Sequence, residues 1–116
     1  RGRLLARRGL LLRPRTPDRI ADFGVAARRA REAGVEKIIC EVDSLDQIEP
    51  ALAAGAHHLL LDNMDDAALA AAVQRIRAHE RQTGKAVIVE ASGNMTLERL
   101  PRVAATGVDL ISMGAL

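Results

Sequence analysis

From residue 20 onward, the hydrophobic and polar positions repeat a short pattern four times. In each repeat a glycine follows a helical pattern, an aliphatic run comes next, and a polar residue or a glycine ends the run. The repeats are "EAGVEKIICE", "AAGAHHLLLD", "TGKAVIVE" and "ATGVDLISMG", which begin at Glu32, Ala53, Thr83 and Ala105. Each aliphatic run is short and bounded, as expected of a buried parallel strand. The glycine in each repeat is expected to end a helix in the left-handed conformation. These glycines are Gly34, Gly55, Gly84 and Gly107.

The segments between the runs have the spacing of amphipathic helices. Residues 20–33 are rich in alanine and arginine, and residues 65–82 place Leu69, Val73 and Ile76 on one face. Both segments are long enough to cover neighbouring strands. We therefore expect each strand to be followed or preceded by a helix.

Two shorter helices are predicted from capping signals. Ser44 and Gln47 have the spacing of a capping box, so a helix is expected to begin there. Thr96 is expected to cap the last helix, whose buried face would include Leu97. Pro101 lies inside this segment, and it is expected to bend the helix or delay its start.

Alternation of helices and strands predicts parallel strands joined by right-handed crossovers. The fold class is therefore α/β, a partial β/α barrel of about four parallel strands that alternate with helices. We assign this domain to residues 19–116. Residues 1–18 form an atypical basic segment that is expected to lie outside it.

The charge distribution separates the same two parts of the chain. Residues 1–19 hold seven arginines and one aspartate, whereas residues 20–116 have a net charge of −4. The basic segment has several interpretations: an arm for an anionic partner, a piece of a targeting peptide, a disordered end, or sequence foreign to the native domain. Its prolines, Pro14 and Pro17, argue against regular structure.

Composition excludes several classes of protein. Phe23 is the only aromatic residue, which argues against modules that bind nucleic acids by base stacking. No apolar run approaches the roughly 18 residues of a membrane span. A single cysteine, Cys40, allows no internal disulfide and fits a reducing cytoplasm. Adjacent residues of a strand point to opposite faces of the sheet, and Cys40 directly precedes Glu41. We therefore expect Cys40 to face the helices as a small hydrophobic side chain.

Acidic residues end three of the four predicted strands. They are Glu41, Asp62 and Glu90. In parallel α/β sheets, ligands bind at the carboxyl ends of the strands. The acids are therefore expected to line one site. A simpler interpretation is that Asp62 or Asn63 only caps the next helix.

Small residues follow the last two strands. Ser92, Gly93 and Asn94 form a turn before a helix, and Gly114 comes at the end of the following strand. Backbone N–H groups in such turns can approach an anion closely. Two glycine-containing turns at adjacent strand ends match the usual phosphate position in β/α barrels.

Four motifs in order resemble one family. They are "EVDS", "LLDN", "SGN" with a threonine two residues later, and the terminal "SMGAL". Over residues 37–116, and more weakly over 18–36, the chain resembles quinolinate phosphoribosyltransferase, also called carboxylating nicotinate-nucleotide pyrophosphorylase. The resemblance implies a Mg²⁺-dependent enzyme of NAD biosynthesis. It would convert quinolinate and phosphoribosyl pyrophosphate into nicotinate mononucleotide, pyrophosphate and carbon dioxide.

The resemblance also implies roles for individual residues. Glu41 and Asp62 would act as catalytic carboxylates that face the ribose and bind Mg²⁺ indirectly, through water. The 5′-phosphate would be held by a second group, which comprises Ser92, Gly93, Asn94, Gly114 and Ala115. The resemblance further implies a cytoplasmic enzyme and, in its intact form, a homodimer, with no nucleic-acid or membrane partner.

The chain departs from the family upstream of "EVDS". Where the family has roughly "LIKDNH", this chain has "RPRTPDR", so Thr16 and Arg19 stand near the family's lysine and histidine. A shifted reading frame would explain the abrupt change near residue 18. Because the family's basic substrate-binding residues lie largely in segments that this chain lacks, we expect little or no turnover from the isolated chain. Two alternatives stay open: a non-catalytic remnant that binds a phosphate ligand or a subunit, and a related barrel enzyme for another heteroaromatic acid.

Overall fold

The structure, a computed structural model, describes residues 9–12 and 22–113. Its strands are β1 (Gly9–Leu12), β2 (Lys37–Val42), β3 (His58–Asp62), β4 (Ile88–Ser92) and β5 (Leu110–Ser112). Its helices are α1 (Asp22–Glu32), α2 (Ile48–Ala53), α3 (Asp66–Thr83) and α4 (Leu100–Ala105), with a 3₁₀ turn at Leu45–Gln47 before α2.

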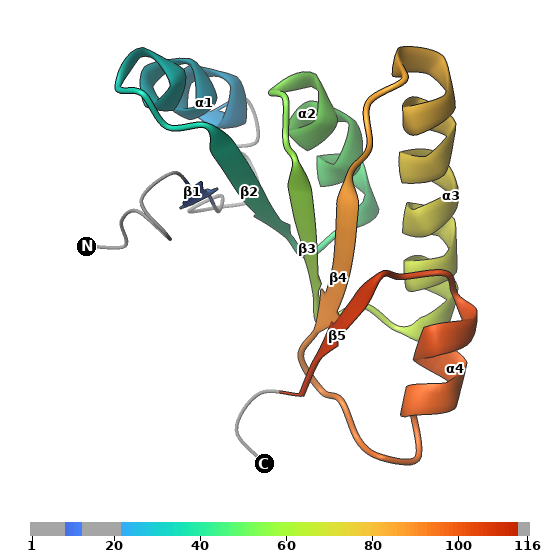
Figure 1. The fold of residues 1–116 in the computed structure, drawn as a ribbon. Helices are drawn as coiled ribbons and strands as arrows, with labels where there is room; N and C mark the ends of the chain where they lie inside the picture. Colours follow the sequence, from blue (N-terminus) through green and yellow to red (C-terminus); the bar gives the residue numbers. More distant parts are fainter. Residues whose placement is uncertain (1–8, 13–21, 114–116) are drawn as a thin grey trace.

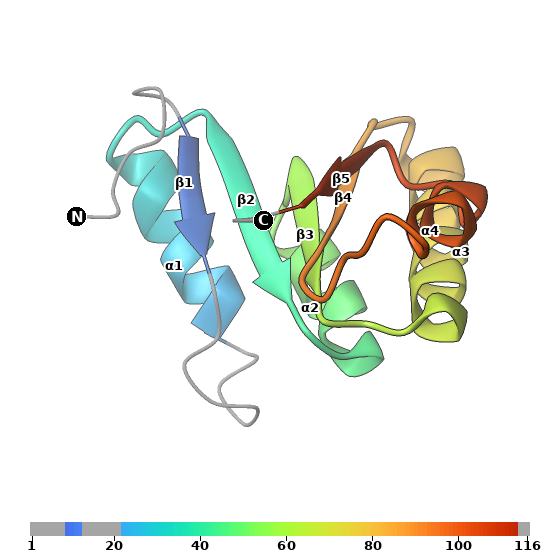
Figure 2. The ribbon, with the colours of Figure 1, turned by 90° about the horizontal axis from the view of Figure 1, so that it is seen from below.

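The five strands form one parallel sheet in the order β1-β2-β3-β4-β5, so spatial order follows chain order. The strands fan out along a curved sheet, and the helices lie on its outer side (Figures 1 and 2). This arrangement confirms the predicted α/β fold of parallel strands that alternate with helices. The four predicted strands correspond to β2–β5.

Strand β1 was not expected from the sequence. The leucine run at Gly9–Leu12 pairs in parallel with β2, with Leu12 opposite Cys40. It lies within the segment whose prolines suggested irregular structure. The run ends before Pro14, so the prolines do not interrupt the ladder itself. The other residues of the basic segment lie outside the described part of the chain.

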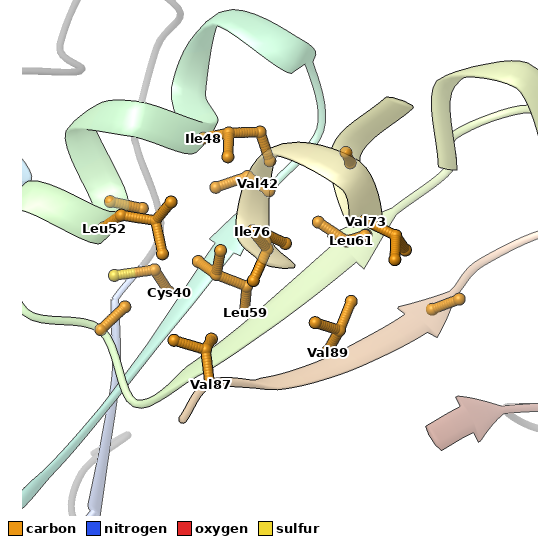
Figure 3. Packing of buried hydrophobic residues seen from close by; sticks show 14 of the residues in the cluster. Cys40, Val42, Ile48, Leu52, Leu59, Leu61, Val73, Ile76, Val87 and Val89 are labelled. Atoms are coloured by element: carbon orange, nitrogen blue, oxygen red, sulfur yellow. The ribbon is translucent and has the colours of Figure 1, made fainter. Parts of the chain in front are cut away.

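The hydrophobic core lies between the sheet and the helices. Every second residue of the central strands is buried in it, whereas the intervening residues are half-buried or exposed on the opposite face. The buried strand residues are Ile38, Cys40, Val42, Leu59, Leu61, Val89 and Ala91. They belong to one cluster with Leu69, Val73 and Ile76 of α3, as the sequence predicted. Figure 3 shows Val73 and Ile76 beside Leu59 and Leu61. We call the opposite side of the sheet the open face.

Cys40 faces the helices, which confirms its predicted orientation. Its side chain is fully buried, and burial raises the pKa of the thiol to about 12. A thiol with this pKa stays protonated at neutral pH and is a poor nucleophile. Cys40 therefore acts as a packing residue.

The start of α2 differs from the sequence prediction. Ser44 does not cap a helix with its side chain; its hydroxyl bonds Asp46, and the Gln47 side chain accepts from the Asp43 N–H at 2.7 Å. The backbone forms a 3₁₀ turn there, because the buried Gln47 side chain closes the loop in place of a regular capping box. The last helix begins late, as Pro101 suggested.

The predicted burial of Leu97 is wrong. Thr96 accepts a hydrogen bond from the Arg99 N–H at 3.2 Å, but residues 97–99 form a turn and α4 starts at Leu100. The Leu97 side chain is therefore 75% exposed, whereas Val103 is fully buried. The helix periodicity holds only from Leu100 onward.

The four glycines that follow predicted helices adopt the left-handed conformation, with φ between 73° and 97°.

Among the described residues, none of the helices combines the length and apolar character that a membrane crossing requires.

Candidate functional site

Three polar side chains form a row at the carboxyl edge of the sheet. Asp62 on β3, Ser92 on β4 and Ser112 on β5 are direct neighbours in register. The Ser92 hydroxyl donates to Asp62 Oδ1 at 3.2 Å. Because parallel strands end at the same edge, residues 30 and 20 positions apart in the sequence meet here. The row joins a predicted catalytic carboxylate to the predicted phosphate turn.

Glu41 lies on the same open face, one row behind Asp62. It is opposite Leu60 in register, and Leu60 is opposite Glu90. Glu41 is half-buried, as is Asp62. The two predicted catalytic carboxylates therefore occupy adjacent strands on one face of the sheet, close to its carboxyl edge.

The turn after β4 is packed tightly against the end of β3. Gly93 has a φ of +83°, and a Cβ atom there would lie 2.8 Å from Asp62 Oδ1 and closer still to Asn63 Oδ1. Only glycine combines this backbone conformation with this close approach. The turn thus lies directly against the Asp62 carboxylate, with no room for a side chain at residue 93.

A pair of asparagines joins the two loops. Asn63 and Asn94 both have positive φ values, 56° and 52°, which asparagine tolerates better than most residues. The Asn94 side-chain amide donates to Asn63 Oδ1 at 3.0 Å, and the Asn63 N–H donates to the Ser92 carbonyl at 3.0 Å. Sequence reasoning placed Asn94 in the phosphate turn but gave Asn63 only a capping role. The position of Asn63 directly after Asp62, at the end of a strand, is the feature of the sequence that could have indicated a place in the site.

Asp62 and Asn63 do not cap the next helix. Asp65 is the N-cap of α3, and its carboxylate accepts from the Ala68 N–H at 2.8 Å. The simpler interpretation of the strand-end acid is therefore wrong. Asp62 remains directed onto the open face, beside Ser92.

A second polar chain crosses the open face below the first. His58 Nε2 lies 2.8 Å from Glu90 Oε1, and the Ser112 hydroxyl bonds the other oxygen, Glu90 Oε2. Both Glu90 oxygens are thus engaged, and the residue ties β3 to β5. This network was not expected from the sequence, because it joins residues on three strands. It favours a structural role for Glu90.

Two predicted phosphate ligands, Gly114 and Ala115, lie outside the described residues. Strand β5 leads towards them and ends at Ser112, in the same row as Ser92. The described part of the site therefore contains the turn after β4 and the end of β5.

The charge of the site is acidic. On strands β2–β5, the carboxyl half of the open face carries Glu41, Asp62 and Glu90 and has neither lysine nor arginine.

Within residues 9–12 and 22–113, no three histidine, cysteine, aspartate or glutamate side chains cluster as a metal cage would require. Mg²⁺ usually takes one or two carboxylates and completes its shell with waters and substrate phosphates. Glu41 and Asp62 suit that partial role and would not hold the ion alone.

The match to a family model decides what this site belongs to. Residues 18–116 match the model described as quinolinate phosphoribosyl transferase, C-terminal domain. The chain belongs to the quinolinate phosphoribosyltransferase family. This confirms the resemblance inferred from the four motifs.

Relatives with curated names agree. The nicotinate-nucleotide pyrophosphorylase [carboxylating] of Mycobacterium leprae is 41% identical over 96 residues, which is 79% of this chain and 32% of that protein. The human protein of the same name is 38% identical over 93 residues, 78% of this chain and 30% of that protein. The chain thus spans about a third or less of the length of these quinolinate phosphoribosyltransferases.

Solved structures of the family share the fold. The nicotinate-nucleotide pyrophosphorylase from Francisella tularensis superposes with a TM-score of 0.72 at 32% identity, and covers 90% of this chain and 34% of that chain. The one from Ehrlichia chaffeensis has a TM-score of 0.72 at 30% identity, with coverage of 91% and 36%. The described sheet is therefore a part of the quinolinate phosphoribosyltransferase fold.

Proposed function

We propose that this chain forms the ribose-phosphate half of a quinolinate phosphoribosyltransferase site in NAD biosynthesis. The intact enzyme would join quinolinate to the ribosyl group of phosphoribosyl pyrophosphate, and release pyrophosphate and carbon dioxide. The observation that carries the proposal is the packed edge where Asp62, Ser92 and Gly93 meet. A carboxylate beside a glycine turn, whose backbone N–H groups can approach an anion, suits a sugar that bears a phosphate.

Each group has a chemical task in this proposal. Asp62 and Glu41 would accept hydrogen bonds from ribose hydroxyls and stabilise positive charge that develops at the anomeric carbon. Their oxygens would also hold Mg²⁺ through its waters, and the bound ion would neutralise pyrophosphate charge. Ser92, Gly93 and Asn94, with Gly114 and Ala115, would donate hydrogen bonds to the 5′-phosphate.

The isolated chain is expected to bind ligand with little or no turnover. Quinolinate is a dianion, and the described open face offers three carboxylates but no lysine or arginine near the carboxyl edge. Like charges repel unless cations neutralise them. This charge balance also favours the second candidate function, a non-catalytic module that binds a phosphate-bearing ligand or another subunit.

Isothermal titration calorimetry with the purified chain tests the proposal. Nicotinate mononucleotide and ribose 5-phosphate are expected to bind, and quinolinate alone is not. Asp62→Asn is expected to remove the Mg²⁺-dependent part of the affinity. The matched control Asp46→Asn, in the exposed part of the 3₁₀ turn, should leave it unchanged. Binding of quinolinate without a phosphate ligand, or no response to either phosphate ligand, would contradict the proposal.

A kinetic assay of the isolated chain with Mg²⁺ and both substrates tests the expected lack of turnover. Little or no release of pyrophosphate is expected, and steady turnover would contradict the proposal that this chain forms only half of the site. We also propose, on the family likeness and the single buried cysteine, a cytoplasmic location and a homodimeric intact enzyme. Fractionation of cells and sedimentation of the intact enzyme would test these two points.

A further inference from the structure

Arg99 lies where the loop after β4 meets helix α4, and its side chain is largely withdrawn from solvent. Only 13% of the side chain is exposed. Its guanidinium makes three directional contacts: Nε with Asp66 Oδ1 at 2.9 Å, Nη2 with the Met64 carbonyl at 2.6 Å, and Nη1 with the Asn94 carbonyl at 3.3 Å. No role in the proposed chemistry accounts for this residue.

The two carbonyls belong to the two loops of the candidate site. Met64 follows Asp62 by two residues, and Asn94 directly follows Gly93. Arg99 therefore bridges the loop that carries the carboxylate and the turn proposed to hold the phosphate. Among the described residues, the loops also meet directly through the bond from the Asn63 N–H to the Ser92 carbonyl.

Asp66, in the first turn of α3, anchors the bridge. It accepts from Arg99 through one oxygen and from Arg102 Nε through the other, at 2.9 Å each. Hydrogen bonds from Arg102 and Arg99 hold the pKa of Asp66 below its usual range, so the carboxylate stays ionised at neutral pH. The two arginines differ in what else they touch: Arg102 is 64% exposed, and both loop carbonyls bond Arg99 instead.

Arginine suits this position for a geometric reason. Its planar guanidinium presents five N–H donors in a fixed fork, and can therefore satisfy three acceptors that point from different directions. A lysine ammonium is a compact charge on a flexible stem and cannot reproduce the fork. Because the donors are directed at Asp66 and the two carbonyls, Arg99 is committed to the protein rather than to a ligand.

We propose that Arg99 is a positioning residue that fixes the spacing between the Asp62 loop and the Gly93 turn. The identity of the ligand that needs this spacing rests on the proposed function, whereas the coupling of the two loops by Arg99 is independent of it. Loss of the guanidinium would free the two carbonyls and let the loops separate. The edge formed by Asp62 and Ser92 would then lose its fixed geometry.

Amide hydrogen exchange at Asn63 tests the coupling, because Asn63 belongs to the bond between the loops and its N–H bonds Ser92 rather than Arg99. In Arg99→Met, which keeps the length of the stem, we expect this amide to exchange at least about tenfold faster than in the wild-type chain, the loss typical of hydrogen bonds to a charged group. Arg102→Met is the matched control, since it also removes a bond to Asp66. It should leave exchange at Asn63 within about twofold of wild type.

Affinity for ribose 5-phosphate is the second readout. Arg99→Met is expected to weaken binding by about tenfold or more, and Arg102→Met to leave it unchanged. If the wild-type chain binds no ribose 5-phosphate while Asn63 exchange still rises in Arg99→Met, the proposed function fails and the positioning role stands. Wild-type exchange at Asn63 in a folded Arg99→Met chain would overturn the inference.

Arg99→Lys covers the case in which the methionine variant does not fold. It retains the charge and the salt bridge to Asp66, but it cannot reach both carbonyls together. We expect a folded chain with accelerated exchange at Asn63 and weakened binding. If Arg99→Lys shows wild-type exchange and affinity, charge alone suffices and the inference is wrong.

Discussion

Gly93 shows how a single residue limits the chemistry of the site. Its left-handed backbone and its close approach to Asp62 leave no room for a side chain. The Ser92 hydroxyl bonds Asp62 and the Asn94 side-chain amide bonds Asn63, so the donors that we propose for the phosphate are the backbone N–H groups of the turn. At this scale the structure explains why a small-residue turn follows β4, and why an asparagine follows the glycine.

Gly93→Ala is predicted to damage both stability and binding. The new methyl group would clash with the Asp62 and Asn63 side chains, and the backbone at residue 93 would be strained. Together these effects should lower the free energy of unfolding by about 1–3 kcal/mol. Measurable affinity for ribose 5-phosphate should be lost, because the turn must move away from Asp62. Urea denaturation and calorimetry would measure the two effects.

Gly84→Ala is the matched control. Gly84 is also left-handed, with a φ of +73°, but a Cβ atom there would meet no atom within 4 Å. Only the backbone strain applies, which costs about 1–2 kcal/mol, and binding should be unchanged. Equal loss of affinity in both variants would show that Gly93 has no special part in the site.

Among the elements, helix α4 and strand β5 show how local signals can mislead. Thr96 lies at the end of the loop that follows β4, but α4 begins only at Leu100, with Pro101 in its first turn. Strand β5 has three residues and lies at the edge of the described sheet, so it needs anchors from outside its own ladder. Both elements depend on contacts that local sequence does not contain.

Val103→Ala and Leu97→Ala are predicted to differ sharply. Val103 is fully buried, so its truncation should cost about 2 kcal/mol of unfolding free energy. Leu97 is 75% exposed, and its truncation should stay within about 0.5 kcal/mol of wild type. Urea denaturation midpoints of the two variants would measure the difference. A larger loss from Leu97→Ala would place residue 97 inside the core instead.

Asp109 is the anchor of β5, and its contribution is predicted to depend on pH. Its carboxylate accepts from the Val89 N–H at 2.8 Å and from Arg77 Nη2 at 3.0 Å. Burial raises the pKa of Asp109, but the Val89 N–H and the Arg77 guanidinium more than offset this and hold the pKa below its usual value. A lowered pKa in the folded state means that the stabilisation is present above the unfolded-state pKa, about 3.9, and is lost as pH falls through the folded-state pKa.

Asp109→Asn should therefore lower stability at pH 7 and flatten the decline of stability in acid. Glu49→Gln is the control, because its ion pair with Arg75 is largely exposed and contributes little. Urea denaturation between pH 7 and pH 3 would measure both variants. An Asp109→Asn chain that declines in acid as steeply as the wild-type chain would contradict the assignment.

For the whole molecule, the decisive feature is a core on one side of the sheet. The helices cover the outer face (Figure 2). The open face carries carboxylates, serines and a few partly exposed apolar residues. Adjacent residues of one strand thus serve different purposes. One residue packs against helices, and the next contributes to the site.

Leu59→Ala and Leu60→Ala test this asymmetry on neighbouring residues of β3. Leu59 is fully buried against the helices, so its loss should cost about 2–5 kcal/mol. Leu60 is only partly buried on the open face, and its loss should cost less than half as much. Thermal and urea denaturation of both chains would measure the ratio. Equal costs would mean that the open face is covered as fully as the helix side.

The amino-acid sequence alone is enough to predict the parallel α/β fold, the four strands β2–β5, the long helix α3 and the family. These features follow from hydrophobic periodicity, glycine helix ends and short motifs, all of which are local along the chain. It also placed Glu41 and Asp62 at strand ends, but it put Ser92 in the following turn, whereas β4 extends to Ser92. Their roles as ligands of ribose, Mg²⁺ and phosphate stay predictions.

Which residues meet depends on how the chain folds in three dimensions. The bonds between Ser92 and Asp62, between His58 and Glu90, and between Arg99 and the two loops join positions that are far apart in the sequence. Strand β1 and the capping of α3 by Asp65 also became known only from the structure. The cause is the register of the strands. Periodicity predicts that a residue lies in a strand, but the pairing of that strand with the next determines which residues lie beside it.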